Sequence, residues 1–296
     1  MNVLASVDPT ALSLVFSSNI YREFGKYGIS PTFANLYSYN FPKSTIKKNQ
    51  TIGNIFDSVY NYMLNQPDRI EYLYKSAIVH NVLLGKHSLN TACMINEFRA
   101  GNRKADIVIM NGNPTAYEIK SEKDNLTRLS KQIESYRLVF STVNIISAEK
   151  HIDTILEMIP RDVGIFTLTK TSSIKTIRQP KNNPSRTVPA MVFESLQILE
   201  AKLLLSSLGI NLPDCPNTEI RSILRDEFIK LSATSVQKAL PEVMRKTRSH
   251  LRLKEYLNKI PNSLKPLALS IKMTIKERAN TISAMNLPAN SIMSWR

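Results

Sequence analysis

Two acidic residues and a lysine stand close together in segments that are typical of neighbouring β-strands. Asp106 lies in the segment 105–110, and Glu118 and Lys120 lie in the segment 115–120. Because side chains alternate between the two faces of a strand, Glu118 and Lys120 point to the same face. Carboxylates from two strands can share one hard cation, and a lysine beside them can polarise water or hold a phosphate oxygen. This pattern favours metal-dependent phosphodiester chemistry.

Further polar residues flank this group at informative spacings. Gln132 and Tyr136 are four apart in a segment with helical periodicity and therefore share a helix face, and Arg128 lies four residues before Gln132. Upstream, Glu97 ends the preceding strand segment and offers another oxygen to a metal. Three basic residues follow it as candidate phosphate contacts, namely Arg99, Arg103 and Lys104.

The order of these residues resembles a known nuclease motif. Asp106, then Glu118-Ile119-Lys120, then Gln132 to Tyr136 looks like the D…(D/E)-x-K…Q-x-x-x-Y order of the PD-(D/E)XK nucleases, the restriction-endonuclease-like superfamily. It is closest to the branch that includes RecB-type and lambda-type exonucleases. The stretch 72–165 also resembles uncharacterised bacterial proteins with an R-A-D…E-I-K-S…Q…Y pattern. The sequence departs from the motif in having Ala105 before the aspartate, and Glu in place of the commoner Asp.

The resemblance implies a role for each matching residue. The implied ligands of Mg²⁺, with Mn²⁺ as an alternative, are Asp106, Glu118, the carbonyl of Ile119 and, as an auxiliary carboxylate, Glu97. Lys120 would orient or activate the attacking water, and Gln132 and Tyr136 would position the nucleic-acid strand. The implied fold is a restriction-endonuclease-like mixed β-sheet flanked by helices.

The periodicity of the chain independently favours such an α/β fold. Strands are expected at 92–98, 105–110, 115–120, 142–147 and 163–168, and helices at 124–140 and 152–158. This order predicts a mixed sheet covered by helices. Helical spacing also extends from 52 to 85, with a break near Gln66-Pro67, and from 191 to 208, where Gly209 is a natural stop.

Composition shifts divide the chain into three expected parts. Residues 1–50 are expected to be irregular or weakly helical, and residues 51–178 to form the nuclease-like domain. The segment 179–189 holds three prolines and is the best candidate linker. Residues 190–296 are expected to form a basic, mainly α-helical domain.

The charge balance favours a polyanionic partner. The chain has 39 Lys and Arg against 24 Asp and Glu, a net charge of +15, and most of the excess lies after residue 170. Clustered cations gain affinity for nucleic acid by releasing condensed counterions. The densest run, which also fits a solvated helix face, contains Arg245, Lys246, Arg248, Arg252 and Lys254.

Several other functions are disfavoured. The eight glycines form neither G-x-G-x-x-G nor a P-loop, and the four histidines have no zinc-site spacing. Cys93 and Cys215 lie 122 positions apart and form no disulfide framework, which favours a reducing, cytoplasmic setting. The first residues lack the basic region of a secretory signal, and no run of eighteen apolar residues occurs, so we expect a protein without a membrane partner.

We therefore expect a metal-dependent nuclease acting on DNA, in phage defence, recombination or repair. Two alternatives stay open, a non-catalytic nucleic-acid-binding protein on the same fold and an RNA nuclease. Cleavage within a strand and cleavage from an end both fit the residues, as does assembly into a homo-oligomer.

Overall fold

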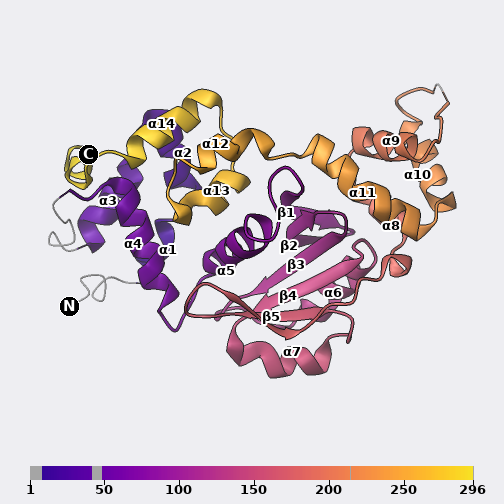
Figure 1. Ribbon diagram of the computed structural model, residues 1–296, viewed down its shortest axis with the longest axis horizontal. Coiled ribbons are helices and arrows are strands. Elements are labelled where there is room, and N and C mark those ends of the chain that lie inside the picture. Colours follow the sequence, from indigo (N-terminus) through magenta and orange to yellow (C-terminus); the bar gives the residue numbers. More distant parts are fainter. Residues whose placement is uncertain (1–8, 42–48, 214, 296) are drawn as a thin grey trace. The chain divides into compact units, whose positions relative to one another are not determined.

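The computed structural model describes residues 9–41, 49–213 and 215–295. The chain divides into two compact units (Figure 1). The helical unit comprises Met1–Val79, Lys170–Ser172 and Arg252–Arg296, and the sheet unit comprises His80–Thr169 and Ser173–Leu251. Among the helices of the described ranges, none has the length and apolar run needed to cross a bilayer.

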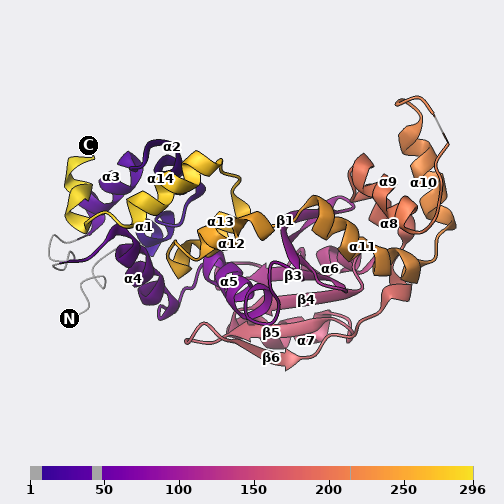
Figure 2. The same cartoon turned by 45° about the horizontal axis from the view of Figure 1, so that its top comes forward.

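Six strands form one sheet in the order in which they occur along the chain. They are β1 Cys93–Ala100, β2 Arg103–Met110, β3 Pro114–Lys120, β4 Thr142–Ser147, β5 Gly164–Leu168 and β6 Ile174–Arg178. The β1–β2, β2–β3 and β5–β6 pairs are antiparallel, whereas β3–β4 and β4–β5 are parallel. Figure 2 shows β6 beside β5 at the edge of the sheet. The expected mixed sheet is therefore confirmed, with β6 as a strand that the sequence did not reveal.

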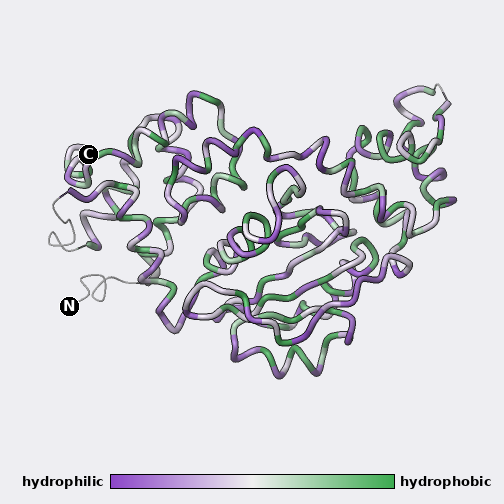
Figure 3. The backbone as a smooth tube through the Cα atoms, in the orientation of Figure 1, coloured by the Kyte–Doolittle hydropathy of each residue, from purple (hydrophilic) through white to green (hydrophobic). Residues whose placement is uncertain are grey.

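The connections explain why the sheet is mixed. A tight turn at Gly112, whose φ is 102°, joins β2 to β3 and keeps them antiparallel. Parallel neighbours need a crossover, and two helices provide it, α6 Leu129–Arg137 and α7 Ile152–Met158. The tube of α7 alternates between hydrophilic and hydrophobic colours, as expected of a helix with one buried face (Figure 3). A short 3₁₀ turn, η4 Glu149–His151, leads into α7.

Helix α6 is shorter than the expected helix 124–140. Residues 121–128 form turns instead, because the Asp124 carboxylate accepts hydrogen bonds from the backbone N–H and hydroxyl of Ser121 at 2.7 and 2.6 Å. The side chain of Asn125 likewise accepts from Thr127. Such side-chain to backbone bonds compete with helix formation.

The sheet unit continues beyond the expected domain boundary. Four helices pack against the sheet in one hydrophobic core, namely α8 Pro189–Glu194, α9 Ile198–Ser207, α10 Ile220–Lys230 and α11 Ala233–Thr247. Phe193, Phe228 and Met244 are fully buried in this core. The expected separate domain 190–296 is therefore not observed, because its first half shares a core with the sheet. The expected helix 191–208 is divided between α8 and α9, and the turn after α9 has Gly209 at a φ of 77°.

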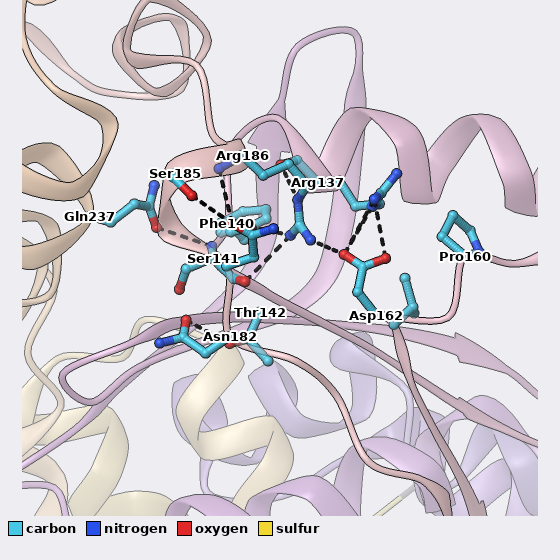
Figure 4. Close-up of polar contacts among 12 residues, drawn as sticks. Arg137, Phe140, Ser141, Thr142, Pro160, Asp162, Asn182, Ser185, Arg186 and Gln237 are labelled. Carbon is cyan, nitrogen blue, oxygen red and sulfur yellow. Dashed lines mark hydrogen bonds and ion pairs between the residues drawn. The ribbon is translucent and has the colours of Figure 1, made fainter.

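The expected linker 179–189 is held against the sheet unit by polar contacts. Arg186, in the 3₁₀ turn η5 Pro184–Arg186, forms an ion pair with Asp162 and donates to the carbonyl oxygens of Arg137 and Phe140, both at 2.9 Å. Asp162 also pairs with Arg137 at 3.1 Å, so one carboxylate bridges two guanidinium groups (Figure 4). Nearby, Gln237 of α11 binds the backbone of Ser141 and Val139. These contacts fix the segment as part of the fold.

The helical unit is built from both ends of the chain. Its helices are α1 Pro9–Leu14, α2 Ser18–Tyr27, α3 Pro31–Asn40, α4 Ile52–Leu64, α5 Glu71–Ile78, α12 Lys254–Leu257, α13 Lys265–Ser270 and α14 Ile275–Met285. Shorter helical turns are η3 Val79–Leu83, which begins at the unit boundary, η6 Leu251–Leu253, η7 Asn262–Leu264 and η8 Ala289–Ser294. The described part of residues 1–50 is therefore mainly helical; the ranges 1–8 and 42–48 of that expected segment lie outside the described residues.

Contacts between distant segments hold this unit together. Thr51 and Pro288 form an antiparallel bridge, and Ile52 donates its N–H to the Leu287 carbonyl at 3.0 Å. An aromatic cluster lies between them and the first helices, with the Phe33 and Phe56 rings stacked at 5.1 Å. These pairings join the first segment of the chain to the last one. For this reason the two segments form one unit, and the expected boundaries at 50, 178 and 190 do not match the observed division.

Candidate active site

Three carboxylate residues occupy one row across β1, β2 and β3. In the β1–β2 register Glu97 lies opposite Asp106. The β2–β3 register, extended by one pair beyond Ile107–Tyr117, places Glu118 opposite Asp106 on its other side. The β1–β2 ladder omits the Glu97–Asp106 pair, and the β2–β3 ladder ends at Ile107–Tyr117. The strands therefore place the three acidic residues at neighbouring backbone positions, and the N–H of Ile119 lies beyond the end of the β2–β3 ladder.

Asp106 binds a backbone group just beyond the end of that ladder. Its Oδ2 accepts a hydrogen bond from the backbone N–H of Ile119 at 2.7 Å. A side-chain carboxylate thus takes the place of a backbone carbonyl in the pairing of β2 with β3. This bond orients Asp106 toward the strand that carries Glu118 and Lys120.

Glu118 and Lys120 form a buried ion pair. Their Oε1 and Nζ atoms are 2.7 Å apart, with 1% of Glu118 and 9% of Lys120 exposed. Lys120 Nζ also donates to Gln132 Oε1 at 3.2 Å, and Glu118 Oε2 lies 2.8 Å from the Tyr136 hydroxyl. The four residues that the sequence grouped by spacings of two and four are thus in direct contact.

Tyr136 connects this group to the end of the β1–β2 hairpin. Its hydroxyl lies 2.5 Å from the carbonyl oxygen of Lys104 and 2.8 Å from Glu118 Oε2. The ring is fully buried and meets Phe140 edge-on. Burial, followed by the charge of Glu118, raises the pKa of the Tyr136 hydroxyl. Tyr136 therefore serves as a neutral hydrogen-bonding group at ordinary pH.

Burial is the dominant electrostatic influence on Glu118. It raises the pKa of the Glu118 carboxyl, and the Lys120 ammonium opposes this shift. A carboxylate in such a place is costly unless cations and hydrogen-bond donors surround it. Together with Asp106, it gives the site two carboxyl groups for one lysine, an arrangement that favours an additional cation.

The hairpin end presents basic side chains close to this site. Arg99 pairs with Lys104 across the hairpin, and the turn contains Gly101 at a φ of 62°. The side chains of Arg99 and Lys104 are exposed, and that of Arg103 is half-buried. Because Lys104 contacts Tyr136 through its carbonyl, these cations lie on the same hairpin end as the site.

Glu97 differs from the other two acidic residues of the row. Its side chain is exposed and its φ is 52°, in the left-handed region that non-glycine residues rarely adopt. In a regular strand, residues three apart point to opposite faces. Ile95 and Phe98 are three apart, yet both belong to the same core, so the alternation of β1 changes between them. Glu97 thus lies at a local irregularity that turns the strand beside Asp106.

The oxygen donors fit Mg²⁺ better than a zinc-type site. Within the described ranges, no group of three or more His, Cys, Asp and Glu side chains is positioned to hold a metal. Mg²⁺ commonly needs only one or two carboxylates, with water and phosphate oxygens completing its shell. Asp106, Glu118 and the carbonyl of Ile119 would supply such oxygens from two adjoining strands.

The remaining basic residues predicted to contact nucleic acid lie in several places. Arg128 is exposed at the start of α6, and Arg245 is half-buried, with its guanidinium 3.5 Å from the Thr91 carbonyl. Lys246 pairs with Glu242 on α11, and Arg252 and Lys254 belong to the helical unit. They do not form the single basic helix face that their spacing indicated.

Arg248 has a structural environment. Its guanidinium donates to both carboxylate oxygens of Glu200 at 2.6 and 2.8 Å, and it lies 5.3 Å from the centre of the Phe98 ring. Glu200 is 1% exposed. Because this guanidinium is committed to a buried carboxylate, Arg248 is a poor candidate for binding phosphate, contrary to the expectation from sequence.

Sequence reasoning missed the polar turn that follows β3. His151 Nε2 lies 3.2 Å from the Ser121 carbonyl, to which it donates, and the Ser147 hydroxyl donates to the Lys120 carbonyl at 3.1 Å. These bonds hold the backbone that directly follows the Lys120 Cα. The serine and aspartate of the segment 121–124 are residue types that favour turns, and they could have indicated this turn in the sequence.

The family described as Bacteriophage P4 protein cII matches residues 65–271. The chain belongs to the bacteriophage P4 protein cII family. Protein cII of Enterobacteria phage P4 is 29% identical over 230 residues, which cover 75% of this chain and 81% of the phage protein. No solved structure matches the chain. The matched range of the cII family includes the whole sheet and the candidate site.

Proposed function

We propose that this cII-family chain is a metal-dependent nuclease that hydrolyses phosphodiester bonds in DNA. The observation that carries the proposal is the buried Glu118–Lys120 pair, at 2.7 Å, on the strand that Asp106 binds through the backbone N–H of Ile119. The name of the phage relative describes no activity, so the support comes from this site and from the motif it resembles.

The proposed roles follow from the donors at the site. Asp106, Glu118 and the carbonyl of Ile119 would hold Mg²⁺, with exposed Glu97 as an auxiliary carboxylate. When bound there, Mg²⁺ would polarise a water molecule and neutralise charge on the phosphate oxygens. The Lys120 ammonium, held beside Glu118 and Gln132, would donate to a phosphate oxygen or to the attacking water.

The reaction balances as an in-line hydrolysis. The oxygen of water bonds to phosphorus as the water loses a proton, and the bond from phosphorus to the 3′ oxygen breaks. The leaving oxygen takes up a proton, which yields a 3′-hydroxyl and a 5′-phosphate. Gln132 would hold the strand beside Lys120, and the exposed hairpin residues Arg99 and Lys104 would contact neighbouring phosphates. Tyr136, expected from the motif to hold the strand as well, is fully buried and would instead orient Glu118 through its hydroxyl.

The direct test is incubation of the full chain with plasmid and linear DNA in Mg²⁺ or in chelator. The proposal predicts Mg²⁺-dependent cleavage, which Asp106→Asn abolishes and the matched variant Asp153→Asn retains, because Asp153 is exposed on α7. Equal cleavage by both variants would reject the site. The plasmid arm separates internal cutting from digestion at ends.

A non-catalytic nucleic-acid-binding protein is the second candidate, and one observation favours it. Lys120 is held by Glu118 and Gln132 in a network that also suits a purely structural role. Salt-sensitive DNA binding together with no cleavage of DNA or RNA in Mg²⁺ or Mn²⁺ would support this candidate over the nuclease. Cleavage of RNA alone would indicate an RNA nuclease.

A further inference from the structure

The basic side chains of the two units differ in how they are neutralised. In the sheet unit many cations contact carboxylates, and these pairs include Arg221 and Arg225 with Glu194, Lys230 with Glu227, Lys246 with Glu242 and Arg248 with Glu200. The helical unit has 16 Lys and Arg against 7 Asp and Glu. Its excess of positive charge therefore has fewer internal partners.

The α2–α14 pair gathers several of these cations. The two helices pack closely, because Gly25 of α2 has no side chain where Met273 and Glu277 approach, and Asn280 of α14 donates to the Gly25 carbonyl at 2.8 Å. Figures 1 and 2 both show α14 alongside α2. We call the exposed side of this pair the α2–α14 surface, and its cations are Arg22, Lys26, Lys272, Lys276 and Arg278.

The acidic residues of the surface are engaged in local structure. Glu277 accepts the backbone N–H of Thr274 at 2.7 Å in the capping box of α14. Glu23 accepts the hydroxyl groups of Ser30 and Thr32 at 2.6 and 2.5 Å at the start of α3. Each carboxylate thus serves a helix start, which leaves the surface strongly positive.

The cations lie around Glu277. Glu277 packs against Gly25, the residue before Lys26 on α2. The hydrogen bonds from Thr274 hold the pKa of Glu277 below its usual range, and the charges of Arg22 and Lys26 lower it further. Lys276 is exposed next to Glu277 in sequence. Within the described ranges, none of the five surface cations forms an ion pair with a carboxylate within 4.0 Å. The guanidinium of half-buried Arg278 donates to the carbonyls of Arg252 and Thr274, whereas the other four cations are exposed and available to an external partner.

Exposed apolar groups interrupt the positive charge. Tyr27 is 58% exposed, with Lys26 Nζ 4.9 Å from the centre of its ring, and Ile275 is 79% exposed. An aromatic ring among cations can stack on a base while the cations contact phosphates. A charged surface with one exposed ring fits a nucleic-acid strand better than an acidic protein face.

We propose that the α2–α14 surface binds the phosphate backbone of nucleic acid, separately from the candidate active site. The proposal rests on the proposed function for the choice of nucleic acid over other polyanions. Phosphate contacts of this kind give affinity without reading sequence, and each cation that contacts a phosphate releases about one counterion.

The test compares two double variants of the full chain that lose the same charge. Lys26→Ala with Lys276→Ala removes two cations of the surface, whereas Arg225→Ala with Lys230→Ala removes two exposed cations of α10 that already have carboxylate partners. Binding to labelled single-stranded and duplex DNA is measured by fluorescence anisotropy in chelator, between about 50 and 200 mM salt. Circular dichroism checks that both variants are folded.

The surface variant is expected to bind both DNA forms more weakly and to lower the slope of log K against log salt by about two. The control variant on α10 should keep a slope close to that of the wild type. Equal changes in the two variants, or none in the surface variant, would overturn the proposal. So would loss of binding to anionic phospholipid vesicles with DNA binding unchanged, because this surface would then serve a membrane.

Cleavage measured with the same variants separates this proposal from the proposed function. A wild-type chain that binds DNA through these lysines but cuts nothing in Mg²⁺ would reject the nuclease and support the surface. If the wild type cuts DNA in Mg²⁺ but the Lys26→Ala, Lys276→Ala variant has the same slope of log K against log salt as the wild type, the surface is rejected and the nuclease is supported.

Discussion

Asp106 accepts the backbone N–H of Ile119 at 2.7 Å just beyond Ile107–Tyr117, the last pair of the β2–β3 ladder. This contact places one carboxylate against the strand that carries the buried Glu118–Lys120 pair. If the ladder continued, a backbone carbonyl could accept the same N–H and leave Asp106 without this anchor. The end of the ladder therefore lets a side chain of β2 bind the strand that carries the other site residues.

The hydroxyl of Tyr136 should stabilise the fold measurably. Tyr136→Phe keeps the ring but removes the donor beside Glu118 and the Lys104 carbonyl, both of which are acceptors. We expect the free energy of unfolding to fall by about 1–3 kcal/mol, measured by denaturant titration. Tyr39→Phe, at a highly exposed tyrosine, is the control and should change little. Equal stability of the two variants would contradict the buried role of Tyr136.

Relief of the backbone at Glu97 should stabilise the protein. Glu97 has a φ of 52°, so Glu97→Gly removes the conflict between its Cβ and the left-handed conformation. We expect a gain of about 0.5–1 kcal/mol in thermal or denaturant unfolding, after the entropic cost of glycine. Asn96→Gly, at the preceding position of β1, should instead lose about that amount. A loss in both variants would show that Glu97 is not strained.

The Glu200–Arg248 pair should give the stability a dependence on acid pH. Burial alone would raise the pKa of Glu200, but hydrogen bonds from Arg248 and the Gln197 N–H outweigh it and hold the pKa below the usual 4.5. The stabilisation is therefore present above that pH and is lost as the pH falls through the lower folded value. Glu200→Gln should flatten the pH dependence of the free energy of unfolding below about pH 4.5 and cost about 3 kcal/mol at neutral pH.

Arg248→Met is the counterpart of that variant. It leaves Glu200 buried without its guanidinium, so the folded protein then favours the protonated carboxyl. Its deficit relative to the wild type should be greatest at neutral pH and shrink as the pH falls. Parallel pH profiles of the wild type and both variants would show that the pair has no electrostatic role.

The sequence predicted the candidate site because its residues are linked by local spacing. Glu118 and Lys120 share a strand face, and Gln132 and Tyr136 share a helix face, so two local periods were enough to group them. The contact of Glu118 with Tyr136, at 2.8 Å, then required only that α6 cover the sheet. The left-handed backbone at Glu97 could not be predicted from the sequence, because glutamate, unlike glycine or asparagine, does not favour a positive φ.

The first helices were missed although their boundaries were visible. Ser17 and Ser30 cap α2 and α3, Pro31 stands in the first turn of α3, and Gly28 ends α2 at a φ of 74°. These are ordinary start and stop signals. The scattered aromatic residues hid the helical period, because they pack on several sides within the unit.

The division into units and the role of Arg248 depend on long-range contacts. The bridge between Thr51 and Pro288 joins segments with no shared local pattern, and Glu200 lies far from Arg248 in sequence. A run of cations looks the same whether or not a distant carboxylate neutralises it. Charge density therefore predicted a basic region but did not identify which cations are paired.

The most direct test of the central claim is the rate of DNA cleavage by Lys120→Met compared with Lys123→Met in saturating Mg²⁺. Lys120 is buried against Glu118, whereas Lys123 is exposed three residues later, so both variants lose the same group in different surroundings. With both shown to be folded by circular dichroism, we expect Lys120→Met to lose cleavage by at least about 100-fold, in the range of other catalytic groups, and Lys123→Met to retain it. Cleavage at the wild-type rate by folded Lys120→Met would contradict the account.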